Sequence, residues 1–95
     1  MSQEDNFHQR TKDRDKVFGL LLTRARVKKG FSQDELARKI PCSQQLISNY
    51  ERGKSLPSYQ VVLRMAYLLG IGERKMREAV VQQKLEAIKR RHGFR

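Results

Sequence analysis

The apolar residues of this chain recur with the spacing of short amphipathic helices, and no segment has the pattern of a strand. The first set occupies positions i, i+3, i+4 and i+7 of one helical face: Phe18, Leu21, Leu22 and Ala25. Gly30 follows, and a glycine in the left-handed conformation commonly ends a helix. The sequence therefore predicts a first helix over about residues 16–29 and an all-α fold.

Two short helices separated by about three residues come next. Ser32 with Glu35 three residues later is the pattern of a capping box, and Pro41 ends the helix that begins there. Ser43 can cap a third helix, over residues 43–52, before Gly53. The apolar positions predicted to face inward are Leu36, Ala37, Ile40, Ile47 and Tyr50. Two helices joined by so tight a turn are a candidate helix-turn-helix, whose second helix enters the major groove of DNA.

A fourth helix begins after Ser58 and ends before Gly70, with Val62, Met65, Ala66 and Leu69 on one face. From Gly72 the pattern has two sides. One stripe contains Met76, Ala79, Val80 and Ala87, and the nearly opposite stripe contains Val81, Leu85 and Ile88. Because a monomer can bury only one stripe, we predict a helix over residues 72–92 whose other face joins two subunits. The candidate contacts are Met76, Val80, Val81, Leu85 and Ile88, and the alternative is a fraying basic tail.

The distribution of charge indicates the kind of partner. The 95 residues have the length of one domain and carry 21 basic and 10 acidic side chains, a formal net charge of +11. Residues 1–16 hold four of each sign, so the whole excess lies from residue 17 onward. Such a charge favours nucleic acid over a membrane as the partner. We interpret residues 1–15 as a disordered leader, 16–71 as a DNA-binding domain and 72–95 as a basic C-terminal helix.

Several classes of function are excluded by what the sequence lacks. One cysteine and two histidines, His8 and His92, leave neither a disulfide framework nor a zinc site. There is no phosphate-binding glycine loop and no paired histidine and carboxylate, so we expect no enzymatic activity, no cofactor and no metal. No apolar stretch is long enough for a membrane span or a signal peptide. The protein is expected to be soluble and cytoplasmic, associated with the nucleoid.

The polar residues of helix 43–52 are of the types that contact base edges in DNA-binding proteins. Gln44 and Gln45 stand at its start, and Asn49 follows about one turn later on the same face. A glutamine or asparagine amide can donate and accept in a bidentate contact with adenine. Ordinary solvated surface is the alternative interpretation of these amides. Cys42, in the turn, is expected to contribute to packing, with redox sensing as the alternative.

Residues 31–53, followed by 56–58 and 68–71, resemble the Cro and lambda-type repressor helix-turn-helix family, also called the Xre family. The resemblance covers residues 17–71 and rests on Gln33, Ala37, Ile47, Glu51, Gly53, Pro57 and Gly70. It implies a five-helix, lambda-repressor-like domain, here with an extended C-terminal fifth helix. Pro41 departs from the family, whose turn commonly has a left-handed glycine. Since proline cannot adopt a positive φ, we predict a variant turn and a slight tilt of the third helix.

The resemblance also implies roles for individual residues. Gln44, Gln45 and Asn49 match positions that reach base edges, while those that match DNA backbone contacts are Ser32, Gln33, Ser43, Arg52 and Lys54. Ala37 lets the two helices touch, and Ile47 anchors the third. Arg26 and Glu51 match an ion pair beneath the DNA-facing surface, the alternative being two separately solvated charges.

These features together predict a transcriptional regulator that binds specific double-stranded DNA sequences, as a repressor and as a homodimer on a pseudo-palindromic operator. Two alternatives stay open. The chain can be an antitoxin that pairs with a toxin and regulates its own operon. Residues 49–62 also resemble multiprotein bridging factors, which would make it a coactivator that contacts the transcription machinery.

Overall fold

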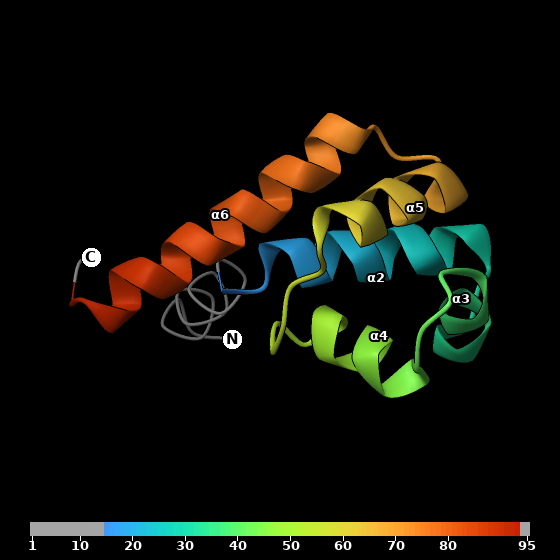
Figure 1. Ribbon diagram of the computed structural model, residues 1–95, viewed down its shortest axis with the longest axis horizontal. Coiled ribbons are helices and arrows are strands. Elements are labelled where there is room, and N and C mark those ends of the chain that lie inside the picture. Colours follow the sequence, from blue (N-terminus) through green and yellow to red (C-terminus); the bar gives the residue numbers. More distant parts are fainter. Residues whose placement is uncertain (1–14, 94–95) are drawn as a thin grey trace, which may run out of the picture.

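The computed structural model describes residues 15–93, which form five helices and no strand. The helices are α2 (Val17–Lys29), α3 (Gln33–Lys39), α4 (Gln44–Glu51), α5 (Tyr59–Leu69) and α6 (Glu73–Arg91). Figure 1 shows α2 in the middle, with α3 and α4 on one side of it and α5 and α6 on the other. The predicted all-α fold with five helices is confirmed. Apart from Asp15, the predicted leader lies outside the described residues.

The helix ends lie where the local sequence signals predicted them. At the start of α3, the Ser32 hydroxyl accepts from the Glu35 N–H and the Glu35 carboxylate accepts from the Ser32 N–H, so the capping box is complete. Ser43 and Ser58 cap α4 and α5 in the same way through their hydroxyls. Gly30 ends α2 in the left-handed conformation, with φ 80°.

One core joins all five helices. Every residue predicted to face inward from α3, α4 and α5 is buried, and so are Phe18 and Leu22 of α2. Leu21 and Ala25 pack partly buried against the same core. Within the described residues, no helix is long and apolar enough to cross a membrane.

The last helix, α6, is part of this core and is not a detached tail. Met76 and Ala79 are buried, and Val80 packs against the core. Val81, Leu85 and Ile88 keep 39–50% of their surface exposed. Of the two predicted stripes, the one that begins at Met76 is therefore docked within the monomer. This docking removes Met76 from the candidate dimer contacts and leaves Val80 mostly covered.

A buried polar residue that the sequence did not predict secures this docking. Gln83, only 4% exposed, points its Oε1 at the first turn of α2 and accepts from the N–H groups of Phe18 (3.0 Å) and Gly19 (3.4 Å). The N-cap residue of α2, Lys16, makes no side-chain capping bond. The first-turn N–H groups of a helix have no partner inside the helix, so an acceptor from elsewhere satisfies them. A residue of α6 thus caps α2.

Replacing Gln83 with methionine, which has a similar length but cannot accept these bonds, should lower the free energy of unfolding by about 1–3 kcal/mol. The N–H groups of Phe18 and Gly19 would remain buried without a partner. Chemical denaturation measures the loss. The same replacement at the exposed neighbour Gln82 is the control and should change stability by about 0.5 kcal/mol or less. Equal effects at both positions would contradict the capping role.

Candidate nucleic-acid interface

The turn between α3 and α4 is tight and contains Pro41. The Ile40–Pro41 peptide bond is cis, and no residue between the two helices has a positive φ. The Cys42 N–H donates to the Ala37 carbonyl at 2.7 Å, which folds the chain back onto α3. The predicted variant turn is confirmed, whereas the tilt of α4 stays a prediction. The Cys42 side chain packs partly buried against the core, and this burial raises the pKa of its thiol, which favours a packing role over redox reactivity.

The inner face of α4 is fixed against α2. Ile47 and Tyr50 are buried, and the Tyr50 ring meets Phe18 edge-on with 6.5 Å between ring centroids. Gly19 permits this approach, because a Cβ there would lie 2.4 Å from the Glu51 carbonyl oxygen and 2.7 Å from that of Tyr50. Sequence reasoning missed Gly19. The signal that could have identified it is a glycine inside a helical pattern, which can indicate that another backbone approaches closely.

An ion pair beneath the outer surface connects three helices. The Arg26 Nε and Glu51 Oε2 atoms are 2.5 Å apart, and the two side chains are only 14% and 7% exposed. Glu51 also accepts from Arg26 Nη2 at 3.2 Å and from Gln33 Nε2 at 3.0 Å, while Arg26 Nη1 donates to the Phe31 carbonyl at 2.7 Å. The carboxylate therefore holds α2, α3 and α4 in register. Gln33 keeps its second N–H for another acceptor.

The outer face of α4 presents the amide side chains. Gln44 and Gln45 are exposed and Asn49 is partly exposed, opposite the buried Ile47 and Tyr50. The three amides therefore lie on the solvent side of the helix, where the Gln45 Nε2 atom donates to Asn49 Oδ1 at 3.1 Å.

Groups suited to phosphate stand at the start of α3 and at both ends of α4. Ser32 and Ser43 are exposed, and because their oxygens accept the cap bonds, their hydroxyl hydrogens remain available as donors. Arg52 and Lys54 follow α4 and are exposed, and neither belongs to an ion pair of residues 15–93. Ser43 and Arg52 thus cap the two ends of the helix that carries the amides, and Gln33, at the start of α3, is linked to α4 through its bond to Glu51.

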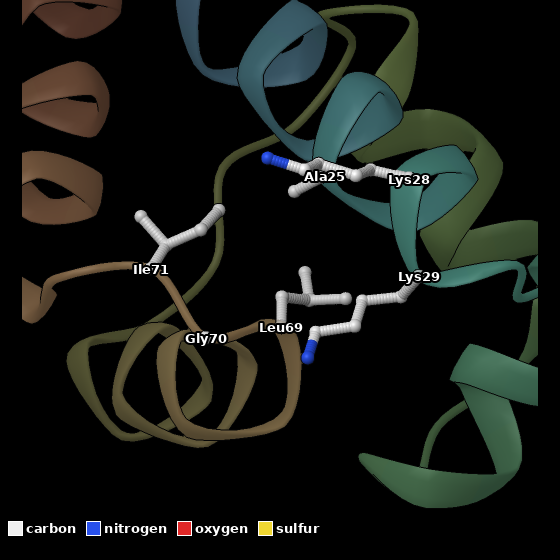
Figure 2. A pocket seen from close by; sticks show the side chains of 6 residues that line it. All are labelled: Ala25, Lys28, Lys29, Leu69, Gly70 and Ile71. Atoms are coloured by element: carbon white, nitrogen blue, oxygen red, sulfur yellow. The ribbon is translucent and has the colours of Figure 1, made fainter.

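A hollow between α2 and the end of α5 lies apart from this interface. Ala25, Lys28, Lys29, Leu69, Gly70 and Ile71 line it (Figure 2). The end of the Lys29 side chain lies beside Gly70, where it meets the negative end of the α5 dipole. This contact explains the position of the Lys29 side chain without a bound ligand. Within residues 15–93 no three histidine, cysteine or acidic side chains are grouped to hold a metal ion.

The family of the chain follows from comparison with known proteins. The family described as "Helix-turn-helix domain" matches residues 17–80, which span all of α2 to α5 and residues 73–80 of α6. The chain belongs to this helix-turn-helix family. The match supports the resemblance to Cro and lambda-type repressors, and the helix-turn-helix domain is a DNA-binding domain.

A solved structure and several curated proteins are similar to this helix-turn-helix chain. The crystal structure of the clp gene regulator ClgR from Corynebacterium glutamicum matches with a TM-score of 0.62 and 25% identity over 84% of this chain and 86% of that one. Multiprotein-bridging factor 1c of Arabidopsis thaliana is 36% identical over 52 residues, 55% of this chain and 35% of that protein. A putative multi-protein-binding factor 1 of Yarrowia lipolytica is 40% identical over 53 residues, 56% and 35% of the respective lengths. The chain thus spans about a third of these curated relatives.

Proposed function

We propose that this protein is a transcriptional regulator that binds specific sequences of double-stranded DNA, acts as a repressor and inserts α4 into the major groove. One observation carries the proposal: the exposed amides of α4 lie opposite its buried face, on a helix that is capped by Ser43 at one end and Arg52 at the other. Amides at base edges discriminate between sequences, whereas hydroxyls and cations at phosphates bind every sequence. The net charge of +11 supplies the attraction to the DNA backbone.

Gln45→Ala and Lys54→Ala should affect binding in different ways. The glutamine variant loses roughly 1–3 kcal/mol of discrimination at one or two operator positions and keeps most of its nonspecific affinity. The lysine variant loses affinity for selected and for random duplexes to the same extent. For the intact chain, log K should fall with log salt at a slope of roughly −5, and the lysine variant should have a slope shallower by about one.

Duplexes selected from a random pool, then titrated at several salt concentrations, provide the measurement. A slope near zero for the intact chain would exclude DNA binding. A uniform loss of affinity in Gln45→Ala, with base preference unchanged, would show that α4 does not read the groove.

The proposal includes a homodimer formed through the outer face of α6. Val81, Leu85 and Ile88 are half-exposed on one side of the helix, while the docked stripe is already used inside the monomer. A two-fold dimer would bring the same face of both copies together. It would present two α4 helices to half-sites about 34 Å apart, one turn of DNA.

Sedimentation of the intact chain and of Leu85→Glu tests the dimer. A truncation before α6 is unsuitable because it would also remove Met76 and Gln83 from the fold. The intact chain should sediment with the mass of a dimer and the variant with that of a monomer, since a carboxylate in the apolar contact would be buried without a partner. Gln82→Glu, with the same added charge beside the stripe, should remain dimeric. A monomeric intact chain would refute this arrangement.

A second candidate function is favoured by the curated relatives. Two of them are named as bridging or binding factors for several proteins, although the chain covers only about a third of each. A coactivator of that kind would bring proteins together without itself reading DNA. If the intact chain enriches no sequence from the random pool and binds no duplex, this candidate takes the place of the first.

A further inference from the structure

Asn49 is the meeting point of two hydrogen bonds on the outer face of α4. Its Oδ1 accepts from Gln45 Nε2 at 3.1 Å and from Arg52 Nη2 at 3.4 Å. An amide oxygen has two lone pairs, so both are engaged and Asn49 keeps only its Nδ2 hydrogens for a ligand. A bidentate contact with adenine requires a donor and an acceptor from the same amide. Asn49 in this arrangement lacks the acceptor.

Gln45 retains both the donor and the acceptor that a bidentate contact requires, whereas Asn49 retains only the donor. Its Nε2 donates one hydrogen bond to Asn49 Oδ1 and has a second hydrogen left to donate, and its Oε1 stays available as an acceptor. The bond to Asn49 also restrains a long, exposed side chain before any ligand arrives. Restraint of this kind lowers the entropy that is lost on binding.

We propose that Asn49 is a positioning residue that orients Gln45 to read adenine and holds Arg52 for a phosphate, a role that presupposes the sequence-specific DNA binding proposed above. Gln45 and Asn49 then act as one recognition unit and read one adenine between them. The Nδ2 hydrogens of Asn49 are left for acceptors, such as the O6 and N7 atoms of guanine or a phosphate oxygen. Gln44 takes no part in these bonds and reads its base pair independently.

The test compares the sequences that variants of the full chain enrich from a random duplex pool. Gln45→Ala should reduce the preference for adenine at one operator position by about tenfold. Asn49→Ala should lose most of the adenine preference at the same position. The double variant, Gln45→Ala with Asn49→Ala, should have no weaker adenine preference there than Gln45→Ala alone. Asn49→Asp keeps two acceptor oxygens, so it should retain the adenine preference while its charge weakens binding to all duplexes.

Gln44→Ala provides the matched control, because its effect should fall at a different operator position and multiply with that of Asn49→Ala. All of these side chains lie on the outer face of α4, so unchanged thermal unfolding verifies that the variants are folded. The positioning role is overturned if Asn49→Ala leaves the adenine preference at the Gln45 position intact and weakens the base preference at another operator position. In that case the losses of preference in the Gln45→Ala, Asn49→Ala double variant would multiply. A wild-type chain that enriches no sequence overturns the proposed function as well, which distinguishes the two failures.

Discussion

Glu51→Ala should lower the free energy of unfolding by about 3 kcal/mol or more, because it leaves the Arg26 guanidinium nearly buried without its counter-charge. Gln33 would lose its partner in the same step. The loss is measured by chemical denaturation. In a double-mutant cycle, Arg26→Ala with Glu51→Ala should cost clearly less than the sum of the single losses.

The exposed pair between Arg38 and Asp34 is the control for this prediction. Its side chains are 76% and 48% exposed, so Asp34→Ala should cost about 1 kcal/mol or less. If Glu51→Ala costs no more than Asp34→Ala, and the cycle shows no coupling with Arg26, the two charges are independent and the pair does not hold the helices together.

Gly19→Ala should lower the free energy of unfolding by an amount comparable to that of Glu51→Ala. The added methyl would lie 2.4 Å from the Glu51 carbonyl oxygen, which belongs to backbone and cannot rotate away, so α2 and α4 must separate. We expect a net loss of about 2–3 kcal/mol, even though alanine is intrinsically better than glycine inside a helix by about 1 kcal/mol. Because α4 carries the amide face, affinity for selected duplexes should fall as well.

Gly72→Ala is the matched control for Gly19. A Cβ at Gly72 meets nothing within 4 Å, and the backbone φ of −58° suits any residue. The cost there should be about 1 kcal/mol or less, which is the range for alanine in place of glycine at a helix N-cap. A Gly19→Ala protein as stable as Gly72→Ala would mean that the helices tolerate the wider spacing. Thermal and chemical unfolding of both variants decide this.

The helices, their ends and the inner faces could be predicted from the sequence because they depend on local signals. The capping box at Ser32, the left-handed glycine that ends α2 and the apolar spacing of α5 each involve residues within a few positions of one another. Such signals act before any tertiary contact forms. The amide face of α4 follows in the same way, because Gln45 and Asn49 are one helical turn apart.

Only the tertiary structure decided which stripe of α6 docks, because the two stripes are similar in apolar character and neither has a local signal that favours it. The buried amide of Gln83 and the unpaired N–H groups of α2 favour one stripe, but they are 64 and 65 positions apart and meet only after the helices pack. The need for glycine at position 19 likewise arises from a backbone that approaches from α4. Contacts between distant segments depend on packing geometry, which short-range periodicity does not encode.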